Sequence, residues 1–310
     1  MIDLPSALNK RATVNRNWTE GSVIQNILLL SWPMIILALL YTANLIFELV
    51  WLGRLGAASI AGVGIAGFIV VLVITIKAGI SAGERALVAR LIGAGDIAGA
   101  NRVVGQAFVI SAAYGALVAV VGILFSTQIF SLFNLEADAL AEGAAYLRIV
   151  LTFWVTEAFW ITSFSVMQAS GDAITPMIIA VVIRVVNAVI YPILILGWWI
   201  FPRLGVSGAA IAYITTTGLG MVICLWILFT GRTRLRLTVR EFYPDLNIIW
   251  RMMRIGIPGS IMGLGKSFGD LVLTWLMIPF GTLALAAHNS IYRIELFISS
   301  PSLGLGLFRL

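Results

Sequence analysis

The 310-residue sequence has few charged residues, a single cysteine and a single histidine. Only 11% of its residues are charged, against about a quarter in soluble globular proteins, and 60% are hydrophobic. Cys224 alone provides neither a disulfide framework nor zinc-ligand spacing, and His288 alone excludes most histidine-based metal sites. No HExxH, Walker A or GxSxG motif is present, so an enzyme is not expected. The composition is typical of an integral membrane protein.

Long charge-free runs alternate with short polar segments along the chain. A helix needs about 20 apolar residues to cross roughly 30 Å of hydrocarbon, and several runs reach this length. We therefore predict an all-α, polytopic membrane protein with eight spans. The predicted spans are residues 24–50, 58–82, 103–127, 145–168, 174–198, 205–230, 256–279 and 283–308.

The net charge of +6 comes from basic residues in short runs between the apolar segments, so we interpret them as topology signals and predict no nucleic-acid partner. If the predicted spans are right, most of the basic residues fall on one side of the membrane. They are Lys10, Arg11, Arg16, Arg85, Arg90, Arg102, Arg232, Arg234, Arg236, Arg240, Arg251 and Arg254. The positive-inside rule then places the N-terminus in the cytoplasm. We expect the membrane to be the plasma membrane, the inner membrane in a prokaryote.

The predicted first span carries one acidic residue, Glu48, with Asn44 one helical turn before it. An ionisable group near the bilayer centre costs about 2.5–3.5 kcal/mol on insertion scales, so its default interpretation is functional. A carboxylate in this setting can bind and release a proton, and Asn44 shares its helical face and can hydrogen-bond to it. The simpler alternative is that Glu48 bonds to a neighbouring helix or reaches the membrane interface.

Asn187 and Tyr191 lie one turn apart in the predicted fifth span, before Pro192. They form a polar patch that could face Glu48 if both helices line one cavity. Interhelical hydrogen bonds worth about 0.6 kcal/mol explain such side chains equally well. We predict that Glu48, Asn44, Asn187 and Tyr191 form one site for a proton or Na⁺, and we expect no cofactor and no other metal.

Aromatic side chains gather in the predicted fourth span, where Trp154 and Trp160 precede Gln168. Such rings could form a wall for a flat organic cation through cation–π contacts of about 0.5–2 kcal/mol, although aromatic belts at the membrane interface are commoner. Together with Asp270 of the seventh span, these three residues form our predicted substrate cavity.

Three further charges, Lys77, Glu157 and Arg184, lie within or near predicted spans. Charges at such depth pair with one another or face a water-filled cavity. We favour a structural pair between Glu157 and Arg184. Lys77 is expected to extend its long side chain to the interface.

The sequence contains an internal repeat. A shift of 225 positions aligns SWP at residues 31–33 with GIP at residues 256–258, and LGAASIAG at residues 55–62 with FGTLALAA at residues 280–287. Parallel repeats of this kind are a transporter architecture. The predicted domains are a cytoplasmic segment (1–23), a six-helix lobe (24–230), a basic cytoplasmic linker (231–254) and the first two helices of a second lobe (255–310). We expect the second half of the linker to be an amphipathic helix that lies on anionic lipid.

Several motifs together resemble the multidrug and toxic compound extrusion (MATE) family of secondary transporters. They are WP at residues 32–33, NLIFELVWLGRLG at 44–56, SAGERALVARLIGAGD at 81–96, MQASGDAITPM at 167–177, the run 187–197, PRLGVSGAAIA at 202–212 and FGTLALAAH at 280–288. The resemblance covers nearly the whole chain after the N-terminal segment. It implies twelve helices in two six-helix lobes around a central cavity, with this chain ending after the eighth helix.

The resemblance also assigns roles to residues. Many prokaryotic members have an aspartate five residues before the glycine that corresponds to Gly53, and this sequence has Glu48 there. The family's fifth-helix aspartate follows the asparagine at Asn187 by four residues and falls on Tyr191, so that carboxylate is missing. Coupling is then expected to rest on Glu48 alone or to involve Asp270.

We therefore expect secondary active efflux of amphipathic, mainly cationic, drugs or toxic metabolites by proton- or sodium-coupled antiport with alternating access. The expected partners are a small-molecule organic substrate and membrane lipids, and a monomer is expected. Two alternatives stay open. One is a flippase for lipid-linked precursors, which usually needs a strongly basic cavity, and the other is a truncated membrane protein that does not transport.

Overall fold

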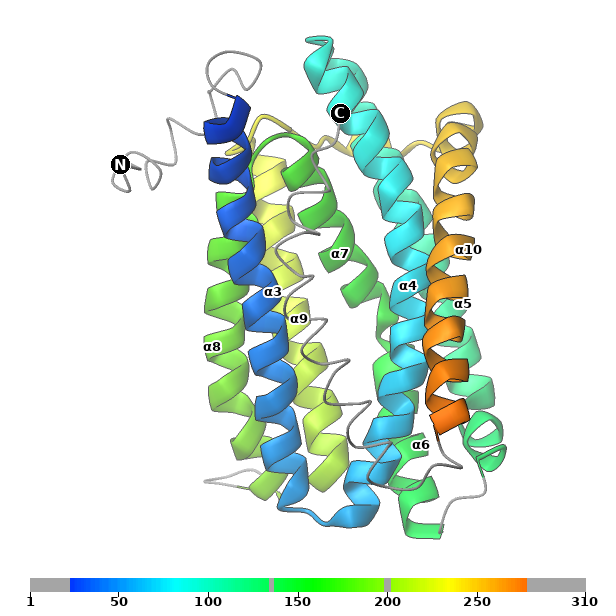
Figure 1. The fold of residues 1–310 in the computed structure, drawn as a ribbon. Coiled ribbons are helices and arrows are strands. Elements are labelled where there is room, and N and C mark those ends of the chain that lie inside the picture. Colours follow the sequence, from blue (N-terminus) through cyan, green and yellow to red (C-terminus); the bar gives the residue numbers. More distant parts are fainter. Residues whose placement is uncertain (1–22, 134–136, 198–201, 278–310) are drawn as a thin grey trace.

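A computed structural model describes residues 23–133, 137–197 and 202–277. Within these residues the chain is built of helices alone, which confirms the predicted all-α class (Figure 1). The elements are α3 (Val23–Gly53), α4 (Ala57–Gly93), α5 (Ile97–Ser131), α6 (Ala137–Thr152), α7 (Trp154–Ala169), α8 (Ile174–Leu196), α9 (Gly205–Thr230), the 3₁₀ helix η1 (Val239–Phe242) and α10 (Leu246–Met277). The predicted eighth span, residues 283–308, lies outside the described residues.

Helix α4 is longer than the predicted second span, residues 58–82. Arg85 and Arg90, which we expected in a loop between two spans, belong to this helix. The turn after α4 is short for two reasons. Gly95 takes a left-handed φ of 76°, which only glycine adopts without strain. Asp96 then caps α5, because its Oδ1 accepts a hydrogen bond of 2.8 Å from a backbone N–H of the first turn.

The predicted fourth span, residues 145–168, is not one continuous helix. Helices α6 and α7 meet at Phe153 with a bend of 55°. Two hydroxyl groups bond to helix carbonyls beside the break: Thr152 Oγ1 donates to the Arg148 carbonyl at 2.6 Å, and Thr156 Oγ1 donates to the Phe153 carbonyl at 2.8 Å. Hydroxyls bonded to backbone in this way are associated with bent helices.

Five of the described helices, α3, α4, α5, α8 and α9, are long and apolar enough to cross a membrane, and the bent pair α6–α7 would be a sixth. Helix α10, which holds the predicted seventh span, does not meet the same criterion over its described length. Large apolar side chains are exposed on the outside of the bundle, for example Val185 and Val189 of α8 and Leu117 of α5. Such a surface suits hydrocarbon better than water, as expected of a multi-pass membrane protein.

The helices form a bundle in which α3, α8 and α9 lie on one side and α4, α5 and α10 on the other (Figure 1). Helices α6 and α7 contact both groups. The core has two hydrophobic clusters, one that includes Trp154 and Tyr191 and a second that includes Phe108, Trp160 and Met252. The bent pair therefore joins the two sides of the bundle.

Helix α10 packs along α4 at a backbone-to-backbone crossing. Gly79 of α4 lies against the backbone of Ser260, and Gly83 lies against the carbonyl group of Met252. A Cβ atom at either glycine would overlap these backbone atoms. Small residues are what lets membrane helices approach so closely, since packing supplies much of their association energy.

Side chains of α5 hold the segment between α9 and α10: Asn101 accepts from the Arg236 N–H at 2.9 Å, Arg102 pairs with Asp245 at 3.2 Å, and the amide of Gln106 is buried beneath the segment. Gln106 Nε2 donates to the carbonyl groups of Glu241 and Tyr243 at 2.7 and 2.8 Å. Its Oε1 accepts from the Asp245 N–H at 2.8 Å, so the side chain satisfies three backbone groups of the segment. These three hydrogen bonds fix the position of the segment just before α10 begins.

The helix expected in the second half of the linker is present from Leu246 onward, where α10 begins, and its contact with lipid stays a prediction. Leu235 and Leu237 are buried in the second hydrophobic cluster. The only regular element between α9 and α10 is the single 3₁₀ turn η1. Helix α10 starts at Leu246, inside the predicted linker of residues 231–254, and runs on into the predicted seventh span.

Replacing Gly79 with Leu should destabilise the crossing of α4 and α10. Overpacking a close contact costs about 1–3 kcal/mol, so the melting temperature in detergent should fall. Gly64 in the same helix has no atom within 4 Å of a built Cβ, and Gly64→Leu is the matched control. The buried thiol of Cys224 allows unfolding to be followed with a maleimide dye. An equal effect of the two substitutions would contradict the packing interpretation.

Replacing Gln106 with Leu should release the segment before α10, because three backbone groups lose their partner. We expect trypsin to cleave the variant faster than the native protein after Arg236 or Arg240, as measured by mass spectrometry. Gln128→Leu, an exposed position in the same helix, should leave the cleavage rate unchanged.

Candidate functional site

The predicted ion site begins with a contact between two residues of α3. Asn44 Nδ2 donates a hydrogen bond of 2.6 Å to Glu48 Oε1, as the spacing of one helical turn predicts. Both side chains are half-buried. The ring of Phe47, the residue before Glu48, lies 5.9 Å from the ring of Tyr191 on α8. Helix α3 therefore packs against α8 in the turn that carries Glu48.

The two predicted residues of α8 take different roles. Tyr191 is almost fully buried and interacts electrostatically with Glu48, so these two belong to one site. Asn187 is also buried, but its Nδ2 donates to Thr216 Oγ1 of α9 at 3.1 Å. The Oδ1 of Asn187 has no hydrogen-bond partner among the described residues. A buried carbonyl oxygen in this state is available to a water molecule or a cation.

A second carboxylate, Glu157 at the start of α7, interacts with the same arginine as Glu48. Arg184 of α8 interacts electrostatically with both carboxylates. Tyr213 of α9 directs its hydroxyl group at the Glu157 carboxylate and interacts with it electrostatically. The Oε2 of Glu157 has no hydrogen-bond partner in the described part of the chain. Glu157 and Arg184 form no ion pair within 4 Å among the described residues, and Arg184 acts on both Glu157 and Glu48 over a longer distance.

Two further tyrosines complete this group. The hydroxyl groups of Tyr41 and Tyr146 interact electrostatically with both Glu48 and Glu157. We name the whole group the polar centre, and it draws on five helices. Its members are Tyr41, Asn44, Glu48, Tyr146, Glu157, Arg184, Tyr191 and Tyr213.

The charge of the polar centre suits a single cation. Two ionised carboxylates and one arginine leave one negative charge, which one proton or one monovalent cation neutralises. The unpartnered carboxylate oxygen of Glu157 is a hard ligand, the type that hard cations prefer. The described residues contain no cluster of three His, Cys, Asp or Glu side chains that could hold a metal ion.

The three described side chains of the predicted substrate cavity, Trp154, Trp160 and Gln168, have different surroundings. Trp154 is fully buried in the first hydrophobic cluster, beside the polar centre, whereas Trp160 belongs to the second cluster and packs against Phe164 and Gly220. Gln168 is half-buried near the end of α7. Asp270 falls in α10, and its side chain lies outside the described residues. A substrate role for these four residues stays a prediction.

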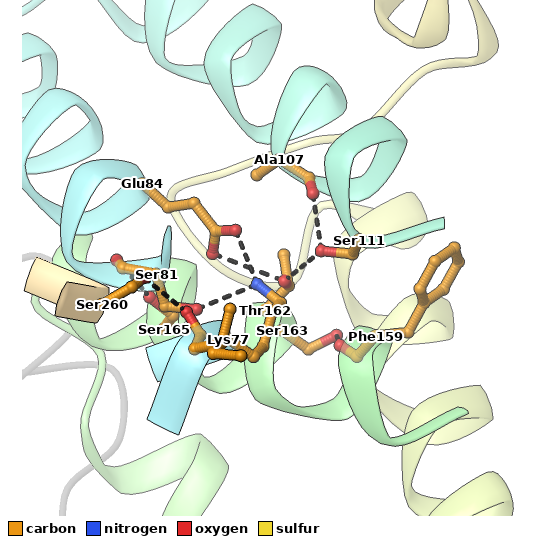
Figure 2. A network of polar contacts seen from close by, with 11 residues as sticks. Lys77, Ser81, Glu84, Ala107, Ser111, Phe159, Thr162, Ser163, Ser165 and Ser260 are labelled. Carbon is orange, nitrogen blue, oxygen red and sulfur yellow. Dashed lines mark hydrogen bonds and ion pairs between the residues drawn. The ribbon is translucent and has the colours of Figure 1, made fainter. Parts of the chain in front are cut away.

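A buried ion pair on α4 was not predicted. Lys77 Nζ lies 2.7 Å from Glu84 Oε1, and neither side chain has any exposed surface (Figure 2). The expectation that Lys77 reaches the interface is therefore wrong. The sequence does contain the signal, because a lysine and a glutamate seven residues apart lie on the same helical face. Glu84 lies in the motif of residues 81–96, which contains several charged residues and is therefore predicted to lie between two spans.

Comparison with known proteins places this geometry in a family. The family model described as MatE matches residues 33–193, which contain α4 to α7 and most of α3 and α8. The matched region includes Glu48, Glu157 and Arg184 of the polar centre and the Lys77–Glu84 pair. The match therefore covers both buried charged groups.

Named relatives are similar over most of this chain. It is 24% identical over 298 residues to "Probable multidrug resistance protein YoeA" of Bacillus subtilis, which covers 95% of this chain and 64% of that protein. It is 25% identical to "Probable multidrug resistance protein NorM" of Thermotoga maritima, over 83% of this chain and 55% of that protein. The chain thus spans less than two thirds of the length of these relatives.

Solved structures share the fold. A MOP superfamily transporter from Pyrococcus furiosus superposes with a TM-score of 0.86 at 26% identity, over 94% of this chain and 64% of that chain. An outward-facing multidrug resistance MATE family transporter superposes with a TM-score of 0.83 at 27% identity, over 93% of this chain and 63% of that chain. The matched family model and the shared helical arrangement show that this chain belongs to the MatE family.

Proposed function

We propose that this chain supplies the ion-coupling lobe of a secondary active exporter, which moves amphipathic, mainly cationic, compounds out of the cell in exchange for H⁺ or Na⁺. The names of the relatives, multidrug resistance proteins and transporters, support efflux as the activity. The polar centre is the observation that carries the proposal. It places two carboxylates and one arginine inside an apolar bundle, where no simple packing role repays the desolvation of the charges.

Glu48 is the proposed ion-binding group of the polar centre. Its Oε1 accepts from Asn44, and Arg184 provides the counter-charge from α8. A coupling ion that binds Glu48 removes the attraction between α3 and Arg184, and its release restores it. Because α3 and α8 pack against each other, ion binding would change the balance between two arrangements of these helices. That change is what alternating access requires of a coupling site.

The sign of the charge favours a cationic substrate over a lipid-linked pyrophosphate. The polar centre has one arginine against two carboxylates, whereas a pyrophosphate needs several cations around it. A net negative site can bind either the coupling ion or a cationic substrate, and competition between them is one route to antiport. We therefore do not propose a flippase.

We also propose a plasma-membrane location with the N-terminus in the cytoplasm. Exposed apolar side chains lie beside exposed arginines where α10 begins: Tyr243, Leu246 and Trp250 with Arg251 and Arg254. This combination suits the boundary between hydrocarbon and anionic headgroups, so membrane lipids are the proposed partners of this surface. The basic ends of α4 and α10 lie at the same end of the bundle (Figure 1).

Replacing Glu48 with Gln should abolish gradient-driven efflux while leaving folding intact, because Gln keeps the shape and loses the charge. A coupling free energy of about 1–3 kcal/mol corresponds to a loss of roughly 5–150-fold. The measurement is efflux of a fluorescent cation from vesicles that contain the full-length protein, with imposed H⁺ or Na⁺ gradients. Glu142→Gln, which removes a carboxylate bonded to Ser59 outside the polar centre, is the control. Undiminished efflux by the Glu48 variant would refute the assignment.

Replacing Arg184 with Gln should lower the melting temperature, because two carboxylates lose their shared counter-charge. Adding Glu157→Gln should recover part of the loss, since one uncompensated charge is removed. This double-mutant comparison in detergent measures the coupling of the two residues directly. Strictly additive effects of the two substitutions would show that Glu157 and Arg184 do not interact.

A further inference from the structure

The buried ion pair of α4 lies outside the polar centre and has a hydrogen-bonded environment of its own (Figure 2). Lys77 Nζ donates to Ser81 Oγ at 3.0 Å and to Glu84 Oε1 at 2.7 Å. Ser165 Oγ of α7 donates to the Ser81 carbonyl at 3.3 Å. The pair is thus enclosed on the side of α4 that faces α5 and α7.

The second oxygen of Glu84 meets a pair of hydroxyl groups. Thr162 Oγ1 of α7 lies 3.4 Å from Glu84 Oε2, and 2.6 Å from Ser111 Oγ of α5. Ser111 Oγ is also 2.7 Å from the Ala107 carbonyl. All three of these side chains are fully buried. A chain of contacts therefore runs from the carboxylate through two hydroxyls to a backbone carbonyl.

Stability alone does not explain the pair. Replacing a buried ion pair by apolar residues of similar volume is often neutral or stabilising, because the desolvation of two charges offsets their attraction. Ionisable residues inside membrane helices are accordingly functional by default. We therefore expect Glu84 and Lys77 to have a function that depends on their charge.

The two hydroxyls can satisfy Glu84 in either protonation state. With Glu84 ionised, Ser111 donates to Thr162 and Thr162 donates to Glu84 Oε2. With Glu84 protonated, the direction reverses: Glu84 donates to Thr162, Thr162 donates to Ser111, and Ser111 donates to the Ala107 carbonyl. The 2.6 Å contact between the hydroxyls allows either oxygen to be the donor. Only hydroxyl hydrogens have to rotate, and every oxygen keeps a partner in both states.

We propose that Glu84 is a second proton-binding residue of this transporter, with Thr162 and Ser111 as its reversible partners and Lys77 as its counter-charge. A proton from water forms an O–H bond at Glu84 Oε2, and the charge of the Lys77–Glu84 pair rises from zero to plus one. Release returns the proton to water and restores the ion pair. Departure of a cationic substrate from the same lobe would balance that charge, so the inference rests on the proposed antiport function.

The other polar and charged groups near the Lys77–Glu84 pair are one arginine and several hydroxyl groups. Arg85 is the further charged group that interacts electrostatically with Lys77, and it comes from the same helix. The groups that α5 and α7 direct at the network are the hydroxyls of Ser111, Thr162 and Ser165. Helix α10 contributes Ser260, which donates to the Ile76 carbonyl at 2.8 Å. Glu84 is the acidic member of this network.

Infrared difference spectroscopy tests the proposal without a substrate. The full-length protein in lipid vesicles is titrated from alkaline to acidic pH, and the C=O stretch of protonated carboxyl groups is followed. We expect one component of this signal to disappear in Glu84→Gln and to persist in Glu48→Gln. Thr162→Val should shift the frequency of that component, because its hydrogen-bond partner is lost. Ser163→Ala, a buried hydroxyl on α7 that bonds to the Phe159 carbonyl, should leave it unchanged.

If Glu84→Gln fails to fold because Lys77 is left unpaired, the double variant Lys77→Met with Glu84→Gln removes both charges together. Loss of the component in that variant supports the proposal. An unchanged carboxyl signal in both variants, or a component that is insensitive to Thr162→Val, overturns it. The Glu48→Gln efflux assay is independent of this signal, so failure of the proposed function and failure of this inference are distinguishable.

Discussion

The cost of placing charge inside hydrocarbon is the constraint on which this bundle depends. Lipid offers no hydrogen bonds, so each buried ionisable group must find its partners within the protein. Glu48 finds Asn44 on its own helix and Arg184 across the interface with α8. Lys77 and Glu84 find each other along α4. The positions of α3, α4, α7 and α8 relative to one another are the ones that make these pairings possible.

The two charged groups occupy different parts of the core. The polar centre lies beside the first hydrophobic cluster, which contributes Tyr146, Trp154 and Tyr191. The Lys77–Glu84 pair lies beside the second cluster, which contributes Val88 and Phe108. Helix α7 takes part in both, through Glu157 at its start and Thr162 one to two turns later. The break before α7 therefore sets the direction of a helix that connects two buried sites.

Close backbone contact holds α10 on α4. Gly79 and Gly83 bring α4 against α10, and Gln106 holds the preceding segment on α5. Helix α10 is therefore positioned by α4 directly and by α5 through the segment that precedes it.

The sequence by itself determined the helical class, most span positions and the Asn44–Glu48 contact, because apolar length and one-turn spacing are local properties of a helix. It also identified Asn187 and Tyr191 as polar residues of α8. Only the tertiary structure decided that Glu157 and Arg184 belong with Glu48, that the fourth span is broken at Phe153, and that Lys77 is buried with Glu84 instead of reaching the interface. Those outcomes depend on which faces of the helices pack together. A membrane helix that is apolar on every side carries no pattern in its sequence that tells which helix lies against which face.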